Sequence, residues 1–114
     1  MRVLIVDDEA PARALLREYL DGHEEADVVG EAANGFEAVK LCTDLQPDLV
    51  LLDIQMPKLS GFEVLELLEL RSARPAVIFV TAHDEHALRA FEVHAVDYLL
   101  KPILKARQES LRER

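Results

Sequence analysis

The sequence is poor in the features that mark secreted and membrane-spanning proteins. Its 114 residues include one cysteine, Cys42, so a disulfide within the chain is excluded and a reducing cytoplasm is the expected compartment. No apolar run approaches the roughly 18 residues that a transmembrane helix needs. Only Arg2 precedes the first short apolar run, and this start does not resemble a secretory signal. We therefore predict a cytoplasmic protein with no membrane association.

Basic residues are also scarce. The 13 Lys and Arg residues stand against 22 Asp and Glu residues, which gives a formal net charge of −9. Binding to the phosphates of DNA or RNA requires a basic surface patch. Direct nucleic-acid contact by this domain is therefore not expected, and any action on DNA would need another segment.

Hydrophobic residues, by contrast, make up half of the chain and follow two alternating patterns. Short apolar runs occupy residues 3–6, 28–29, 49–52, 76–80 and 96–100, and most of them are continuous, as is typical of strands covered on both faces. Between the runs, apolar residues recur at helical spacing: Ala12, Leu15, Leu16 and Tyr19; Ala38, Leu41, Cys42 and Leu45; Val64, Leu65 and Leu68; Ala87, Leu88 and Phe91. The alternation of strand and helix predicts one doubly wound α/β domain with a mainly parallel sheet.

Local signals at the expected element boundaries agree with this fold. Asn34 is followed three residues later by Glu37, and Ser60 by Glu63, which is the capping-box pattern of a helix start. Cys42 lies in an apolar helical face, so we interpret it as a core residue rather than a reactive thiol. All prolines fall at element edges, where a missing N–H costs least: Pro11, Pro47, Pro57, Pro75 and Pro102.

Polar residues stand at the ends of four of the expected strands. In an open parallel sheet, the carboxyl ends of the strands form the rim where ligands bind. One such residue alone is as well explained by a turn or a helix cap, but several strands together predict a shared site. The residues are Asp7 and Asp8 after the first strand, Asp53 after the third, Thr81 at the end of the fourth and Lys101 after the fifth.

Three carboxylates, a hydroxyl and an ammonium group at one rim favour magnesium-dependent phosphoryl chemistry. Neighbouring carboxylates repel one another, and a divalent cation relieves this repulsion. Mg²⁺ suits oxygen ligands completed by water and a substrate phosphate, with Mn²⁺ able to substitute, whereas the inventory offers no zinc-like set of Cys and His. A carboxylate beside the metal can attack phosphorus and form an aspartyl phosphate. A lysine and a hydroxyl can then contact the phosphoryl oxygens.

Four motifs together resemble the receiver domain of two-component response regulators. They are Asp7-Asp8, the DIQMP segment at 53–57 followed by Gly61, the VTA segment at 80–82, and DYLLKP at 97–102. The match runs in the family's order through essentially the whole chain. It implies a flavodoxin-like, five-stranded parallel sheet in the order 2-1-3-4-5, with helices on both faces. It also makes residues 1–114 one phosphoacceptor receiver domain.

The resemblance assigns a role to each matching residue. Asp53 is the phosphoacceptor and, with Asp8, a direct magnesium ligand; the backbone carbonyl of Gln55 is a further ligand and Asp7 acts through water. Three more residues complete the switch machinery: Thr81 is the switch hydroxyl, Lys101 the cation that pairs with the phosphate, and Tyr98 the aromatic residue whose rotamer follows phosphorylation. Tyr98 has the plainer alternative of a half-buried strand residue.

Partners and output follow from the same resemblance. A sensor histidine kinase is the expected phosphoryl donor, and phosphorylation is expected to promote homodimerisation through the surface of helix 4, strand 5 and helix 5. The segment from residue 79 to residue 102 is most similar to receivers that precede a LytTR-type DNA-binding domain, which implies a transcriptional role. That output domain is absent from this chain, so we expect a piece of a longer regulator, with a stand-alone receiver as the alternative.

Three further interpretations stay open at this point. A small aspartyl-phosphate phosphatase would place a D-x-D pattern after the first strand, whereas here Asp7 and Asp8 are adjacent and the candidate nucleophile follows the third strand. A degenerate receiver would act only as an interaction module, but it would not need the full set of site residues. His83 and His86 stand at a helical spacing that could hold a metal or sense pH, although histidines at this spacing are more often solvated helix residues.

Overall fold

The computed structural model of the protein describes residues 1–71, 75–82 and 97–100, the last of these by the course of the backbone. Helices and strands alternate along the chain up to the fourth strand. The strands are β1 (Arg2–Val6), β2 (Asp27–Ala32), β3 (Leu49–Leu52), β4 (Ala76–Thr81) and β5 (Asp97–Leu100). The helices in these residues are α1 (Ala10–Asp21), α2 (Gly35–Leu45) and α3 (Gly61–Leu70).

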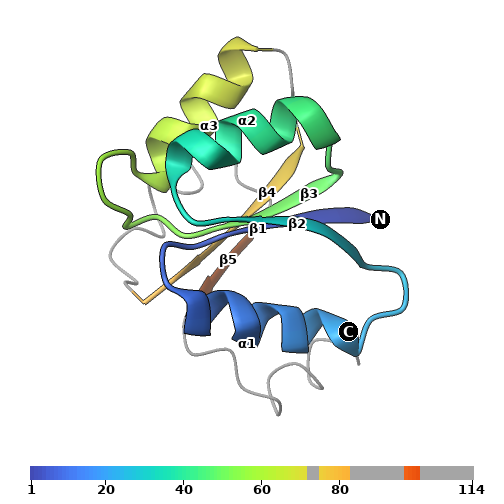
Figure 1. Ribbon diagram of the computed structural model, residues 1–114. Helices are drawn as coiled ribbons and strands as arrows, with labels where there is room; N and C mark the ends of the chain where they lie inside the picture. The colour runs from blue at the N-terminus through green and yellow to red at the C-terminus, as the bar shows by residue number, and fades with distance from the viewer. Residues whose placement is uncertain (72–74, 83–96, 101–114) are drawn as a thin grey trace.

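The five strands form one sheet in the order β2-β1-β3-β4-β5, and every neighbouring pair is parallel. Helix α1 covers one face of the sheet, while α2 and α3 lie side by side on the other (Figure 1). The doubly wound fold and the strand order are therefore confirmed. The order reverses between β1 and β3, which makes the carboxyl ends of these two strands the natural ligand site.

Strands β1 and β3 lie at the centre of the core and supply both of its halves. Alternate side chains of a strand point to opposite faces. Leu4 and Val6 of β1 accordingly pack in the cluster under α2 and α3, whereas Val3 and Ile5 pack in the cluster under α1. Every residue of β3 is buried, from Leu49 to Leu52. Continuous apolar runs were the right signal for these central strands, since both faces are covered.

The apolar face of α3 matches the expectation, and those of α1 and α2 match in part. In α2, Ala38 and Cys42 are buried, whereas Leu41 and Leu45 are half-buried. All three predicted core residues of α3 are buried: Val64, Leu65 and Leu68. In α1, however, the buried positions are Leu16 and Leu20, and the side chain of Leu15 is 40% exposed. Successive residues point about 100° apart around a helix, so an inward Leu16 turns Leu15 to the edge of the face. The predicted helix with Ala87, Leu88 and Phe91 lies outside the described residues.

The two predicted capping boxes differ in the structure. Ser60 accepts from the backbone N–H of Glu63, and the Glu63 carboxylate accepts from the Ser60 N–H, so this box is complete. Asn34 accepts from the N–H of Glu37, but the Glu37 carboxylate accepts from Ala33 instead. The extended backbone of Asn34 brings the preceding N–H within reach of Glu37, so that the expectation of a reciprocal box was wrong by one residue.

The environment of Cys42 and the length of the helices bear on two further expectations. Cys42 is a free thiol with 1% of its surface exposed, and burial raises its pKa to about 11, as a core residue requires. Among the helices of the described ranges, none is both long enough and apolar enough to span a membrane.

Candidate functional site

Three carboxylates meet where β1 and β3 end. Val6 and Leu52 are register partners in these neighbouring strands, so the residues that follow them emerge side by side at the sheet edge. One carboxylate oxygen from each of Asp7, Asp8 and Asp53 lies within 4.8 Å of the other two. Asp7 is 0% exposed and Asp53 is 5% exposed, while Asp8 is partly buried. The predicted convergence of these three residues is therefore observed.

The backbone around Asp7 is fixed on three sides. Its N–H donates to the carbonyl oxygen of Ala32 at 3.1 Å, which extends the β1–β2 pairing by one residue. Its side-chain Oδ1 accepts from the N–H of Glu9 at 2.9 Å, just before α1 begins. Its carbonyl oxygen accepts from the Nη1 of Arg13 at 2.8 Å. These bonds hold the Asp7-Asp8 turn in one conformation between the strand and the helix.

Asp53 is held by the chain on both sides of it. Its N–H donates to the Val6 carbonyl at 3.0 Å, and its Oδ1 accepts from the N–H of Gln55 at 3.4 Å. The N–H of Gly61 donates to the Ile54 carbonyl at 2.8 Å and so draws the start of α3 against this turn. A Cβ on Gly61 would fall 3.0 Å from the Cα of Ile54 and collide with the carbonyl group of Asp53. Gly61 is therefore needed for the close approach of α3 to Asp53.

The electrostatics of the cluster favour a bound cation. At 4.8 Å and an effective dielectric constant near 20, each carboxylate pair repels by about 3 kcal/mol if both groups are charged. A divalent cation would replace this repulsion with attraction. Three carboxylate oxygens from a partly buried site are the hard ligands that Mg²⁺ accepts, with water completing its octahedron. The residues present therefore fit magnesium.

Three further predicted residues fall within the described part of the chain: Thr81, Gln55 and, by its backbone, Tyr98. Thr81 ends β4 and is 0% exposed; it stands two residues beyond Phe79, the register partner of Leu52, and so on the same rim as Asp53. Gln55 follows in the turn after Asp53, with its side chain exposed. Tyr98 has a described backbone in β5, beside Phe79. Lys101, His83 and His86 are outside the described residues.

Arg13 and Glu31 were missed by the sequence reasoning. They are 18 residues apart, and neither belongs to a motif that marks a site. Their contact depends on the packing of α1 against β2, which no local pattern shows. An arginine in the first turn after an Asp-Asp pair was the one available signal.

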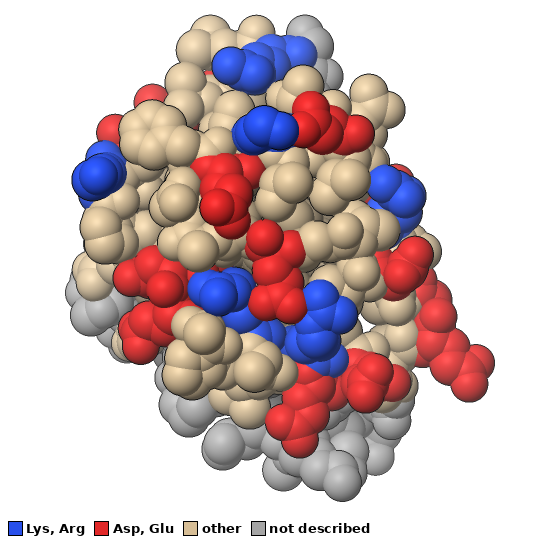
Figure 2. Space-filling view, in the orientation of Figure 1, with Lys and Arg blue, Asp and Glu red and all other residues tan. Residues whose placement is uncertain are grey.

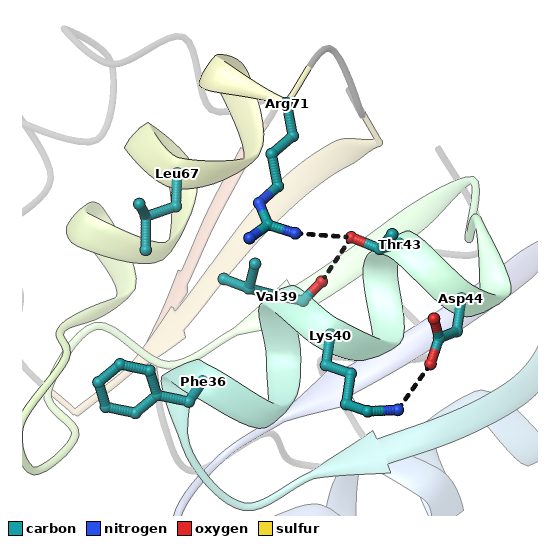
Figure 3. Close-up of a pocket in the computed structure, with 7 residues that line it drawn as sticks. All are labelled: Phe36, Val39, Lys40, Thr43, Asp44, Leu67 and Arg71. Atoms are coloured by element: carbon teal, nitrogen blue, oxygen red, sulfur yellow. Dashed lines mark hydrogen bonds and ion pairs between the residues drawn. The ribbon is translucent and has the colours of Figure 1, made fainter.

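A separate hollow of about 500 Å³ lies on the outer side of α2 and α3 (Figure 3). Lys40 and Asp44 form an ion pair of 2.8 Å at its edge, and Arg71 donates to the hydroxyl of Thr43 at 3.4 Å. Phe36 and Leu67 supply apolar walls. None of the carboxylates of the rim cluster lines this hollow, so it is distinct from the candidate metal centre.

Comparison with known proteins points to one family. The family model of the response regulator receiver domain matches residues 3–113. Transcriptional regulatory protein BtsR of Salmonella typhi is 50% identical over 109 residues, which cover 96% of this chain and 45% of BtsR. The chain thus spans less than half the length of that curated relative.

Solved structures agree with this assignment. The response regulator domain of Thermotoga maritima CheB has a TM-score of 0.84 at 35% identity, with 99% of this chain and 91% of that chain covered. A chain of the CheX–CheY–BeF3–Mg²⁺ complex from Borrelia burgdorferi has a TM-score of 0.85 at 27% identity, with 96% and 84% covered.

Proposed function

The chain belongs to the response-regulator receiver domain family, a family of signalling domains, and we propose that phosphorylation of Asp53 with Mg²⁺ controls its activity. The observation that carries this proposal is the cluster of Asp7, Asp8 and Asp53, with oxygens within 4.8 Å at the rim where the strand order reverses. Buried Asp53 is the carboxylate fixed by the β1–β3 pairing and by α3. It is therefore held in one position for an in-line attack, and the resemblance to receiver domains selects it among the three carboxylates.

In the proposed reaction, an oxygen of Asp53 attacks the donor's phosphorus, and the bond between phosphorus and the donor's leaving atom breaks. The product is an aspartyl phosphate on this chain. Asp8, Asp53 and the backbone carbonyl of Gln55 would hold Mg²⁺, with Asp7 acting through water. When bound, Mg²⁺ neutralises charge on the transferring phosphoryl oxygens. Mn²⁺, with the same preference for oxygen ligands, would substitute.

Three side chains would respond to the new phosphoryl group on Asp53: those of Thr81, Lys101 and Tyr98. The hydroxyl of Thr81 donates a hydrogen bond to a phosphoryl oxygen, and Lys101 pairs with the added negative charge. Movement at Thr81 frees space that Tyr98 fills. The surface around β5 then changes, and the equilibrium shifts toward a state that binds a partner. The domain is thus a switch that takes part in its own phosphorylation, rather than an enzyme with a separate substrate.

The proposed partners are a sensor histidine kinase as donor and a second copy of the chain after phosphorylation. Residues 1–114 act as one receiver unit in the cytoplasm, without direct nucleic-acid or membrane contact. Similarity to BtsR, a transcriptional regulatory protein, supports a transcriptional output. The resemblance of residues 79–102 to receivers that precede a LytTR-type DNA-binding domain is the basis for proposing that such a domain carries this output. A stand-alone receiver that acts through protein contacts is the alternative. Dimerisation predicts a larger sedimentation coefficient after phosphorylation, and an unchanged coefficient at full phosphorylation would contradict it.

Intact-mass spectrometry tests the proposed function. The chain is incubated with acetyl phosphate and Mg²⁺, with a chelator added to a parallel sample. We expect the mass of one phosphoryl group, lost on treatment with base, absent with the chelator and absent in Asp53→Ala. Absence of labelling in a wild-type chain that is folded by circular dichroism would refute the proposal.

A further inference from the structure

Two arginines on α1 share one glutamate on β2. Arg13 Nε lies 3.2 Å from Glu31 Oε1, and Arg17 Nη2 lies 2.7 Å from Glu31 Oε2. Basic side chains accordingly alternate with acidic ones over α1 and β2 (Figure 2). The side chain of Arg13 is 19% exposed, whereas that of Arg17 is 50% exposed. The inner pair is thus the better shielded from solvent, and the outer pair contributes little to stability.

Arg13 also reaches the backbone of the acidic cluster. Its Nη1 donates to the carbonyl oxygen of Asp7 at 2.8 Å, while its Nε faces Glu31. This carbonyl belongs to the peptide that joins Asp7 to Asp8, so its orientation sets the direction in which Asp8 leaves the strand. Residue 32, which accepts the N–H of Asp7, directly follows Glu31 in β2. The guanidinium therefore fixes the Asp7–Asp8 peptide to the same strand that pairs with Asp7.

Charge balance is the second property of this arrangement. A guanidinium next to a divalent cation would weaken binding of that cation by repulsion. Glu31 lies 3.2 Å from Arg13 and offsets its charge, while the planar guanidinium of Arg13 keeps its hydrogen bond to the Asp7 carbonyl. Because Arg17 pairs with the same carboxylate, the three side chains together carry one net positive charge instead of the two that the arginines alone would bring.

We propose that Arg13 is a positioning residue that sets the magnesium affinity of the Asp7, Asp8 and Asp53 cluster, with Glu31 orienting its guanidinium and compensating its charge. This inference rests on the proposed magnesium-dependent function. The hydrogen bond from Arg13 goes to the backbone carbonyl of Asp7, so Arg13 acts through the peptide that carries Asp8. Residues that orient metal ligands from outside typically change affinity 10–100-fold when they are replaced. Since Arg13 acts on the backbone, we expect an effect near the lower end, about tenfold.

Arg17→Gln is the matched control, because it also removes one positive charge from α1 and one ion pair with Glu31. Mg²⁺ is titrated into the wild-type, Arg13→Gln and Arg17→Gln chains by isothermal calorimetry. By charge alone, loss of either arginine would strengthen Mg²⁺ binding. A positioning role predicts the opposite sign for Arg13: a Kd about tenfold higher in Arg13→Gln, with Arg17→Gln at or below the wild-type value.

Circular dichroism establishes whether each variant is folded. If Arg13→Gln does not fold, Arg13→Lys carries the test, because a single ammonium keeps the charge but cannot replace the fork that spans Asp7 and Glu31. We expect a several-fold higher Kd in Arg13→Lys as well. A wild-type Kd in the folded Arg13 variant, or an equal loss of Mg²⁺ affinity in Arg17→Gln, would overturn this inference and leave the proposed function standing. Absence of Mg²⁺ binding by the wild-type chain would instead refute the proposed function.

Discussion

Replacement of Gly61 by alanine is the sharpest structural test of how the site is built. The added Cβ would lie 3.0 Å from the Cα of Ile54 and 3.1 Å from the carbonyl carbon of Asp53. Both neighbours are backbone atoms, so no side-chain rotation can relieve the contact. Either α3 or the turn after β3 must move. Movement of the turn displaces Asp53 from the carboxylate cluster.

The expected cost follows from three contributions. Inserting a methyl group into a packed contact costs about 1–3 kcal/mol. Separation of α3 from the turn weakens the 2.8 Å bond from the Gly61 N–H to the Ile54 carbonyl, a bond worth about 1 kcal/mol. Alanine recovers up to about 1 kcal/mol over glycine within a helix, and less in its first turn. The net loss is about 2 kcal/mol, or roughly 8 °C in Tm for a domain of this size.

Urea unfolding followed by far-UV circular dichroism measures this loss. Gly30→Ala is the control, because its Cβ would meet the ends of flexible side chains, with Leu45 Cδ1 at 3.1 Å and Leu4 Cδ1 at 3.4 Å. We expect Gly30→Ala to change the free energy of unfolding by less than about 1 kcal/mol. A Gly61→Ala protein as stable as the wild type, or less affected than Gly30→Ala, would show that the close approach of α3 is not needed.

Other parts of the structure make three further predictions. Asp8→Asn removes one repelling charge. Because Asp8 is partly exposed, solvent screens most of its repulsion, so without metal the variant should be more stable than the wild type by on the order of 1 kcal/mol. Mg²⁺ should no longer raise its Tm as it raises that of the wild type, and a wild-type shift with Mg²⁺ would exclude Asp8 as a ligand. Ser60→Ala removes the complete capping box and should cost about 1 kcal/mol in urea unfolding, and a loss too small to measure would contradict the assigned cap. Burial raises the pKa of Cys42 from 9.0 to about 11, so the folded state holds the thiol proton more tightly than the unfolded state does. The free energy of unfolding should therefore fall as pH rises from 9.0 to about 11, and an equally steep fall in Cys42→Ala would assign this dependence to other groups.

The strand ends of the site could be predicted because their signals are local. A buried strand such as β3 appears as a continuous apolar run, and Asp53 follows it directly. Strands of a parallel sheet all end at one edge, so the convergence of Asp7, Asp8 and Asp53 needed no distance information. Glycine at position 61 was part of the recognised motif, but the reason for it appeared only with the Cβ contacts.

Features that depend on packing between distant segments could not be predicted. Arg13 and Glu31 meet because α1 crosses β2, and no periodicity links two residues 18 apart in different elements. Leu15 fits the helical spacing as well as Leu16 does, so the rotation of α1 against the sheet decides which of them is buried. Asn34 has the sequence of a full capping box, but the backbone directs Glu37 to Ala33.

Localising the phosphoryl group tests the central claim most directly. The chain is phosphorylated with acetyl phosphate and Mg²⁺ and reduced with borohydride, which converts an aspartyl phosphate to homoserine. The product is then digested and sequenced by tandem mass spectrometry. We expect homoserine at position 53, with Asp7 and Asp8 unchanged. Homoserine at position 7 or 8, or phosphate stable to borohydride on another side chain, would contradict it.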